Sequence, residues 1–314
     1  MLTLIAKRVL SAIPVLFIVT LLTFSMVHMI PGDAAVSASG ENASAAQIEV
    51  TRGRLGLDKP PVEQYVTWIG GLLKGDLGTS LLSSHRNIDS IMEALPVTAS
   101  LAVVALTWSL IVGVAAGVLA GLHRGTFIDK WLTGLTTLGI SMPSFWLGLL
   151  LVTYFALRFP LFPATGYSPL GDGFSNWLSH LVLPACALGA VTAAEIARQT
   201  RAGMVDVLER DYIRTAVAKG LPRRSVVMKH AAKNAAVPVV TIFGLQAANL
   251  IGGAIIVEQV FGMPGLGSLV LKAILERDLP VVQAFVVVIT LFVLLINMLV
   301  DISYAYFNPK VRQS

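Results

Sequence analysis

The chain has 314 residues, of which 55% are hydrophobic and 13% charged, and its formal net charge is +5. Soluble domains carry about 25% charged residues, so this composition excludes an ordinary soluble protein and is typical of a polytopic membrane protein. The single cysteine, Cys186, excludes an internal disulfide and a cysteine-based metal site.

Six apolar segments are long enough to cross about 30 Å of hydrocarbon, which takes about 20 helical residues. They are residues 9–30, 97–122, 131–157, 177–197, 236–257 and 281–304. The first segment could instead be a cleaved signal peptide, with residues 36–38 (Val-Ser-Ala) as the cleavage site. Its apolar core is too long for a typical signal sequence, so we expect an uncleaved span.

Residues 31–96 form the longest polar region of the chain. Its first part, residues 34–50, is rich in Ser, Ala and Gly and fits a solvated loop as well as an ordered segment. Further on, Tyr65, Trp68 and Leu72 share one helical face. Residues 60–82 therefore predict a short amphipathic helix, either at the membrane surface or packed on a small extramembrane lobe.

Small residues and a proline mark the second and third spans. Gly113, Gly117 and Gly121 recur at every fourth position, a spacing that lets helices approach closely in lipid. Pro143 must bend or interrupt the third span, and irregular backbone at that depth is tolerated inside protein or beside a cavity.

Polar or flexible side chains near the kinks of the third and fifth spans are therefore candidates for lining a translocation pathway, with simple packing as the alternative for each. These candidates are Ser141, Met142, Phe145, Gln246 and Asn249.

Basic residues are distributed unequally over the segments between the spans. With six spans, 15 Lys and Arg fall on the side of the two termini, and eight fall on the other side together with twelve acidic residues. The positive-inside rule then predicts that both termini are cytoplasmic and that residues 31–96 face the exterior.

The segment 195–234 is the only long polar stretch in the second half of the chain, and it carries nine basic and four acidic residues. Its apolar residues have helical spacing, and the run Gly220, Leu221, Pro222 interrupts that spacing. A loop between spans does not need this much order, so the segment is interpreted as a docking surface.

Motifs for catalysis or for metal binding are absent from the sequence. It contains no G-x-x-x-x-G-K-[ST] phosphate loop, no H-E-x-x-H, no C-x-x-C and no G-x-S-x-G, and its five histidines lack metal-ligand spacing. The interiors of the spans also lack the acidic residues that ion coupling requires, which disfavours a secondary transporter or channel subunit. We therefore expect a non-catalytic chain without a bound cofactor or metal that depends on a partner for energy.

Several stretches, in order along the whole chain, resemble one family of transport proteins. Residues 214–240 (RTAVAKGLPRRSVVMKHAAKNAAVPVV) resemble the EAA loop of binding-protein-dependent ABC importer permeases, in the version of the dipeptide, oligopeptide and nickel permease family. Residues 31–33, 55–81, 95–101, 141–151 and 252–267 and the tail 308–312 agree with the same family. The residues 214–216 (Arg-Thr-Ala) stand where the general motif has Glu-Ala-Ala, so Glu-mediated contacts are not carried over to Arg214.

The resemblance implies an all-α membrane protein with the type I ABC importer permease fold, located in the bacterial cytoplasmic (inner) membrane. It implies residues 1–30 as an N-terminal helix, 31–96 as an extracytoplasmic lobe, 97–307 as a five-helix core containing the coupling loop 198–234, and 308–314 as a cytoplasmic tail. A coupling helix over about 221–229 would contact an ATPase. The residues implied in this contact are Arg214, Thr215, Ala216, Gly220, Leu221, Pro222, Arg223, Arg224, Val227 and Lys229.

The partners implied are a second permease subunit, two cytoplasmic ATPases that hold ATP and Mg²⁺, an extracytoplasmic binding protein and membrane lipid, without nucleic acid. The function implied is ATP-driven import of di- or oligopeptides. A nickel chelate, glutathione or another small solute is the alternative substrate.

Overall fold

The computed structural model describes residues 2–29, 34–39, 44–54, 56–83, 85–222, 225 and 232–307. These residues form helices and connecting turns, and their one extended pairing is an isolated antiparallel bridge between Thr79 and Arg86. The chain divides into two compact units, one made of Val97–Pro264 with the segment from Leu295 onward, the other of Leu2–Pro96 with Gly265–Leu294. The predicted all-α fold is confirmed.

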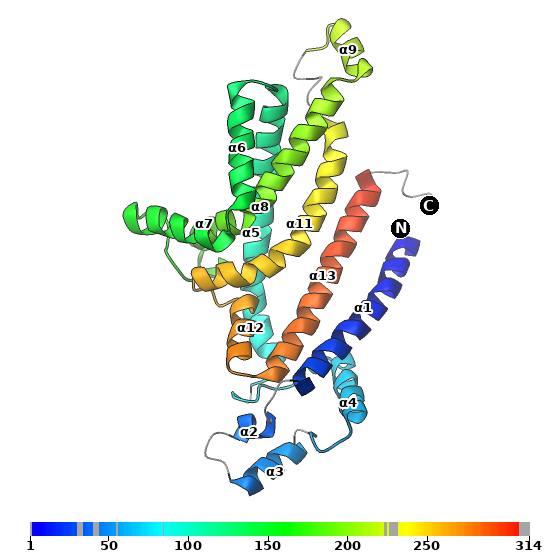
Figure 1. The fold of residues 1–314 in the computed structure, drawn as a ribbon, viewed down its shortest axis with the longest axis vertical. Coiled ribbons are helices and arrows are strands. Elements are labelled where there is room, and N and C mark those ends of the chain that lie inside the picture. Colours follow the sequence, from blue (N-terminus) through cyan, green and yellow to red (C-terminus); the bar gives the residue numbers. More distant parts are fainter. Residues whose placement is uncertain are drawn as a thin grey trace. The chain divides into compact units, whose positions relative to one another are not determined.

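The helices are named in chain order, as in Figure 1. They are α1 (Leu2–Met29), α2 (Ala34–Ser39), α3 (Ala45–Arg54), α4 (Pro61–Leu73), α5 (Asn87–Leu122), α6 (Phe127–Ser141), α7 (Ser144–Leu151), the π-helix η1 (Val152–Arg158), the 3-10 turn η2 (Leu170–Asp172), α8 (Phe174–Leu208), α9 (Asp211–Ala218), α11 (Ala232–Val260), α12 (Leu266–Leu275) and α13 (Leu279–Phe307).

Among the residues that the structure describes, four helices are individually long and apolar enough to cross a membrane, and up to six spans result if each of two bent pairs counts as one. The four are Arg8–Met26, Asn87–Leu122, Phe174–Leu208 and Leu279–Met298. The bent pairs are Phe127–Ser141 with Ser144–Arg158, and Thr241–Leu250 with Gly252–Val260. Each of these segments overlaps one of the six apolar stretches expected from the sequence, and the helices Asn87–Leu122 and Phe174–Leu208 extend beyond the predicted spans.

Helix α8 is the centre of the unit that contains it, because α6, α7 and α11 all contact it. Figure 1 shows α8 between α6 and α11. The main core cluster joins α5, α8 and α11 through buried residues such as Leu101, Leu181, Val257 and Phe261. Close van der Waals packing of these side chains stabilises the association of the helices within the unit.

The third predicted span does not form one continuous helix. Helix α6 ends at Ser141, Met142 and Pro143 have extended backbone, and α7 starts at Ser144. The two arms are bent by 109°, a much sharper change than the kink expected from the sequence. Pro143 lacks an N–H and disfavours helical backbone at Met142, so the helix stops before the pair and restarts after it.

The other unit contains short helices in the region for which the sequence fits a solvated loop and an ordered segment equally well. Residues 34–39 form α2, and residues 45–54 form α3. Ser44 and Gln47 form a capping box at the start of α3, in which the Ser44 N–H donates to Gln47 Oε1 at 2.8 Å. The predicted amphipathic helix is confirmed as α4, which begins with Pro61 at its first position.

The turn before α13 is held by a buried carboxylate in this same unit. The Ser80 hydroxyl donates to Asp278 Oδ2 at 2.5 Å, and the Leu81 N–H donates to Asp278 Oδ1 at 3.1 Å. Asp278 is only 4% exposed. These bonds join two segments that are almost 200 positions apart in the sequence, so they fix the loop 79–83 against the start of α13.

Candidate functional site

The polar segment 195–234 begins as a continuation of α8. This helix has 35 residues and is about 52 Å long at 1.5 Å per residue, which exceeds the hydrocarbon thickness of about 30 Å. The sequence placed the end of the fourth span at Ala197, but the helix continues to Leu208. The last three turns of α8 therefore carry the first part of the polar segment away from the membrane core.

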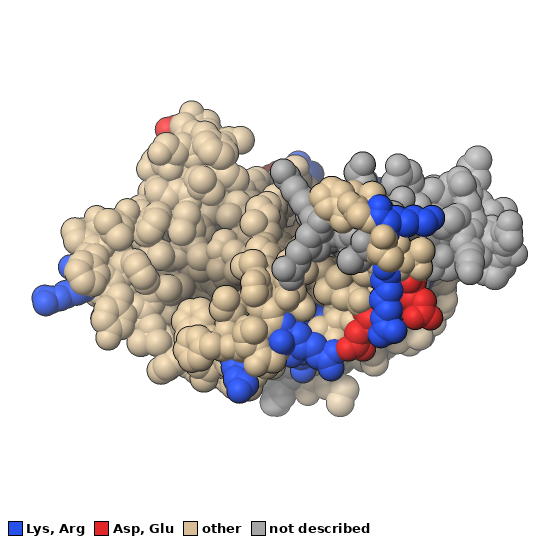
Figure 2. Space-filling view, turned by 90° about the horizontal axis from the view of Figure 1, so that it is seen from above, with Lys and Arg blue, Asp and Glu red and all other residues tan. Residues whose placement is uncertain are grey.

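Arginines of the polar segment form ion pairs with nearby acidic residues. Arg198 contacts Glu195 at 2.6 Å, Arg210 contacts Asp206 at 2.6 Å and Arg214 contacts Asp211 at 3.8 Å. Glu209 pairs with Arg124, which lies in the turn between α5 and α6. Figure 2 looks onto the end of the molecule that carries α9, where basic and acidic side chains lie next to one another.

A small apolar cluster attaches α9 to the end of α8. Met204, Val207 and Ile213 are buried, and Val118, Leu122 and Leu208 pack against them. The cluster combines residues of α5, α8 and α9, so α9 is packed directly against two long helices.

A buried ion pair joins α8 to the first turn of α6. Arg201 donates from Nε to Asp129 Oδ1 at 2.5 Å and from a terminal nitrogen to Oδ2 at 2.8 Å. The Gly125 N–H also donates to Asp129 Oδ2, at 2.9 Å. The side chain of Asp129 is 5% exposed and that of Arg201 34% exposed. This bidentate geometry fixes the relative orientation of the two side chains as well as their separation. The start of α6 is therefore held firmly against α8.

The glycine spacing of the second span corresponds to a close contact between α5 and α8. A methyl group added at Gly113 would lie 2.7 Å from the Ala193 carbonyl oxygen, and one at Gly117 would lie 2.5 Å from the Ala197 carbonyl oxygen. Gly121 faces the side chain of Met204 in the same way. The prediction that these glycines permit close helix packing is confirmed.

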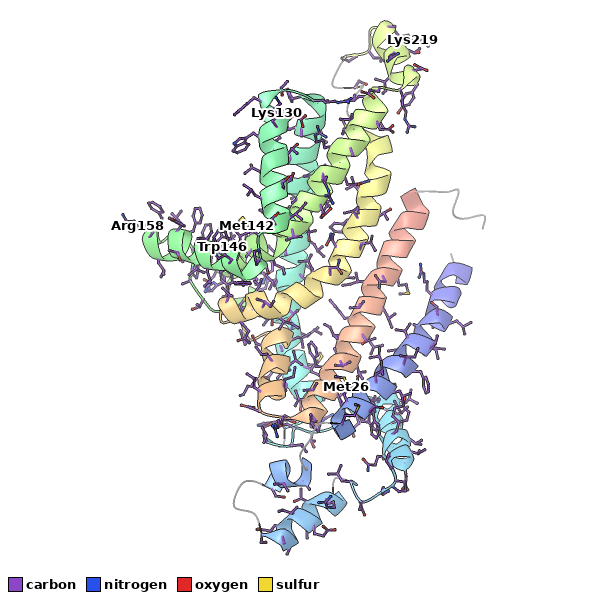
Figure 3. The ribbon with its side chains drawn as sticks, viewed as in Figure 1. Met26, Lys130, Met142, Trp146, Arg158 and Lys219 are labelled. Carbon is purple, nitrogen blue, oxygen red and sulfur yellow. The ribbon has the colours of Figure 1, made fainter. Side chains whose placement is uncertain are left out.

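A cavity of about 210 Å³ lies where the break between α6 and α7 meets α8 and α11. Its polar lining residues are Ser144, Thr192, Gln246 and Asn249, and none of its lining residues is charged. Met142 belongs to the same lining, and Figure 3 shows it at the bend between α6 and α7. This chemistry suits hydrogen bonding to a neutral polar group rather than neutralising a strong charge.

Three of the five pathway candidates, Met142, Gln246 and Asn249, are thus brought to one cavity. Ser141 lines a separate cavity of about 190 Å³ with Arg198 and Arg201, and its hydroxyl donates to the Thr137 carbonyl at 2.9 Å. Phe145 is 44% exposed and lines neither cavity.

The candidate coupling residues are only partly described. Arg214, Thr215 and Ala216 belong to α9, and Gly220 has a φ of 78°, which only glycine adopts without steric cost. Leu221 is 40% exposed, and Pro222 is exposed as well. Arg223, Arg224, Val227 and Lys229 lie outside the described residues, as does most of the predicted helix 221–229.

Glu258 is a buried carboxylate near the end of α11 that was not predicted from the sequence. The fifth span was predicted to end at residue 257, but Glu258 lies inside the helix and is 0% exposed. The Thr98 hydroxyl of α5 donates to Glu258 Oε1 at 2.6 Å. The apolar residues Val260 and Phe261 follow Val257 at helical spacing and continue the pattern past Glu258, and this was the signal that the helix extended further.

Within the part of the chain that the structure describes, no three His, Cys, Asp or Glu side chains lie close enough together to hold a metal ion. The features that remain as candidates for function are the polar segment with its connection to α5 and α6, and the uncharged cavity at the α6–α7 break.

Comparison with known proteins relates these features to one family. Residues 113–313 match the family described as "Binding-protein-dependent transport system inner membrane component". Residues 1–102 match its N-terminal region, described as "Binding-prot-dependent transport system membrane comp, N-term". Together the two matches cover almost the whole chain.

Relatives of similar length carry names of transport permeases. A permease of Brucella abortus (strain 2308) that is named for a peptide transport system is 44% identical over 312 residues, which are 99% of each chain. The glutathione transport system permease protein GsiC of Escherichia coli (strain K12) is 42% identical over 312 residues, again 99% of each chain.

Solved structures show the same fold at low sequence identity. A chain of the inward-facing MetNI methionine ABC transporter superposes with a TM-score of 0.58 at 17% identity, covering 70% of this chain and 97% of that one. A chain of an amino acid ABC transporter crystallised with histidines gives a TM-score of 0.52 at 14% identity, covering 70% and 94%. The chain therefore belongs to the family of inner-membrane permease components of binding-protein-dependent transport systems, and it is a multi-pass permease subunit of an ABC importer.

Proposed function

We propose that this permease subunit forms part of the pathway for small peptides of two or a few residues. The observation that carries this proposal is the full-length likeness, at 44% identity, to a permease named for a peptide transport system. The glutathione permease is similar over the same length, and glutathione is itself a tripeptide. Peptide groups are the feature that these two substrate classes share.

The uncharged cavity at the α6–α7 break supports the same proposal. Gln246 and Asn249 offer amide donors and acceptors, and Ser144 and Thr192 offer hydroxyls. Such groups can pair with the N–H and C=O of a peptide whatever its side chains are. A nickel chelate or another small solute is the alternative, and it belongs to the same transport architecture.

We propose that both chain termini and the polar segment 195–234 are cytoplasmic. The support is the excess of Lys and Arg on that side of the six spans, 15 against eight. The lobe formed by residues 31–96 then faces the exterior, where it is available to a substrate-loaded binding protein. Residues 97–307 would form the transmembrane core, with 308–314 as a cytoplasmic tail.

The polar segment is proposed to couple the permease to an ATPase. Its acidic residues Glu195, Asp206, Glu209 and Asp211 are engaged by arginines, whereas residues 223–234 contain four basic residues and no acidic residue. The positive charge that remains for a partner is therefore concentrated after the Gly220 turn. An acidic groove on a cytoplasmic ATPase matches this charge.

The chain itself is proposed to be non-catalytic, with ATP and Mg²⁺ held by two partner ATPases. A second permease subunit would complete the pathway. ATP binding would favour one conformation of the assembly through contacts that differ between its states. The apolar cluster of Met204, Val207 and Ile213 would carry that difference from α9 into α8 and α5.

Transport by the reconstituted system tests the substrate proposal. The permease, its co-purifying subunits and its binding protein would be placed in vesicles, and ATP-dependent uptake of labelled dialanine and trialanine would be measured. Glutathione and nickel–histidine serve as competitors. Uptake of a peptide that the nickel chelate does not inhibit is expected; uptake of the chelate alone would reject the peptide assignment.

Variants of the turn after α9 test the coupling proposal separately. Gly220→Pro, and the double reversal Arg223→Glu with Arg224→Glu, should abolish stimulation of the ATPases while the assembly still forms. Lys59→Glu, a charge reversal in the outer lobe, serves as the control. Normal ATPase stimulation in both turn variants would contradict the assigned role.

A further inference from the structure

Helix α4 packs against the membrane-spanning helix α1 through an aromatic cluster. The Tyr65 hydroxyl lies 3.0 Å from the Thr20 hydroxyl. The ring of Phe24 stacks on Trp68 with centroids 6.1 Å apart and meets Tyr65 edge-on at 5.4 Å. Thr20 is 6% exposed, so this contact covers a polar group in the middle of α1.

A second apolar stripe of α4 is not covered by the protein. Val62, Val66 and Leu73 are 75%, 63% and 85% exposed. Their spacing of four and then seven residues places them along one line of the helix. Thr67 and Lys74 are also exposed, but they lie on the opposite side of the helix from the aromatic face. The helix thus has an apolar half, only part of which packs on α1.

The position of Thr20 along α1 gives the depth of this contact. The apolar segment of α1 starts at Arg8 and ends at Met26. Thr20 is twelve residues beyond Arg8, which corresponds to about 18 Å along the helix, and the hydrocarbon layer is about 30 Å thick. Phe24 is about 6 Å further on. Tyr65 and Trp68 therefore contact α1 inside the hydrocarbon layer, in the half that is farther from Arg8.

We propose that α4 is a membrane-embedded helix whose stripe of Val62, Val66 and Leu73 contacts lipid acyl chains in the leaflet farther from Arg8. The side of α1 that faces away from Thr20 and Phe24 is exposed as well, because Leu22 and Met26 there are 58% and 64% exposed. Figure 3 marks Met26 near the end of α1. The inference depends on the membrane location of the chain, and it is independent of the substrate and of the coupling mechanism.

The ends of α4 agree with a helix that is embedded in one leaflet and has the headgroups within reach of its charged side chains. Lys59 pairs with Glu63 at 2.8 Å at the start of the helix, and Lys74 follows its last residue. Charged groups at both ends and on one side can reach the headgroups, while Tyr65 and Trp68 are of the type that gathers at the membrane interface. The polar side of α4 would then face water or headgroups.

Spin labelling in the assembled transporter tests the proposal. The single native cysteine is removed as Cys186→Ala, and a nitroxide is attached at Val66→Cys or Leu73→Cys in vesicles of phosphatidylethanolamine and phosphatidylglycerol. Collision rates with oxygen and with a water-soluble nickel chelate are then measured. Thr67→Cys is the matched control on the polar side of the same helix, and Leu22→Cys is the lipid-facing reference on α1.

The label at residues 66 and 73 should show an oxygen-to-nickel accessibility ratio several-fold higher than the label at residue 67 and close to that at residue 22. Equal nickel accessibility at residues 66 and 67 would place the stripe in water and overturn the proposal. Low accessibility to both reagents at residue 66 would mean that another protein surface covers the stripe, which would overturn it as well.

A second measurement leaves the stripe and the native cysteine unchanged. Fluorescence quenching by lipids brominated along their acyl chains is compared between the wild-type protein and Trp68→Phe. The difference should show Trp68 quenched by these lipids more strongly than by aqueous iodide. Stronger quenching by iodide would contradict the depth assigned to α4.

Discussion

Arg201 and Asp129 form the most buried ion pair among the described residues. The pair stabilises the fold only while both partners are present. Breaking a fully buried pair destabilises a protein by about 3–5 kcal/mol, because one charge is left without a partner. The side chain of Arg201 is 34% exposed, so water can compensate part of this loss. We therefore expect this pair to contribute more to stability than an exposed ion pair does.

Arg201→Met should lower the free energy of unfolding by about 2 kcal/mol, because the carboxylate of Asp129 remains buried without its main donor. Thermal unfolding in detergent measures the effect. Arg210→Met is the control, since its exposed pair with Asp206 should contribute less than about 1 kcal/mol. The double variant Arg201→Met with Asp129→Leu should recover much of the stability, and a loss equal to the sum of the single effects would argue against coupling.

The hydroxyl of Thr98 is expected to stabilise the fold, because it donates a hydrogen bond to the fully buried carboxylate of Glu258. Thr98→Val removes a donor at 2.6 Å and should destabilise the protein by about 1–3 kcal/mol, whereas Thr98→Ser should retain most of the stability. Thr107→Val is the comparison, because Thr107 is exposed and its hydroxyl bonds only within its own helix. Melting temperatures that are the same for Thr98→Val and Thr107→Val would show that the hydrogen bond contributes nothing.

At the scale of elements, the contact between α5 and α8 depends on glycine. Backbone atoms of α8 occupy the space that a side chain at Gly113 or Gly117 would need, and backbone cannot move aside as a flexible side chain can. In lipid, helices associate through close packing rather than through the hydrophobic effect. The three glycines therefore determine how tightly the two helices approach.

Gly117→Ala should destabilise the protein by about 1–3 kcal/mol through overpacking, and it should lower the yield of assembled transporter. Gly134→Ala is a matched control in α6, because nothing lies within 4 Å of an added methyl group there. That substitution should be neutral or stabilising by up to about 1 kcal/mol, since alanine favours the helix. Equal melting temperatures for the two variants would contradict the packing role of Gly117.

At the scale of the whole molecule, transport should depend on the uncharged cavity at the α6–α7 break. Asn249→Trp fills part of a space of about 210 Å³ and should reduce peptide uptake strongly while the complex still assembles. Ile256→Trp is the control, because Ile256 is 49% exposed and does not line this cavity. Unchanged peptide uptake in the Asn249→Trp variant would show that this cavity is not part of the translocation pathway.

The orientation of the chain can be measured by labelling single cysteines in the Cys186→Ala background. Lys74→Cys should react with a membrane-impermeant maleimide in intact spheroplasts, and Lys219→Cys should react only after the membrane is opened. Both positions are exposed in the structure. The reverse pattern would show that the termini face the exterior.

The sequence by itself determined the membrane class, the six apolar stretches, the amphipathic helix α4 and the close-packing role of the glycines in the second span. Each of these follows from a local property, such as length, hydropathy or spacing, that does not depend on distant residues. The membership in the permease family was also accessible, because seven short stretches that resemble the family occur in the right order along the chain. The basic segment after α8 was recognised from its charge and its Gly-Leu-Pro break.

Only the tertiary structure decided which distant residues meet. The sequence could not show that Asp129 pairs with Arg201, that Thr98 contacts Glu258, or that Ser141 and Phe145 lie apart from the cavity containing Met142. A proline predicts a break, but the 109° angle between the two arms depends on what each arm packs against. The physical reason is that pairings between separate helices depend on side-chain packing and buried polar contacts across the fold, which local patterns do not encode.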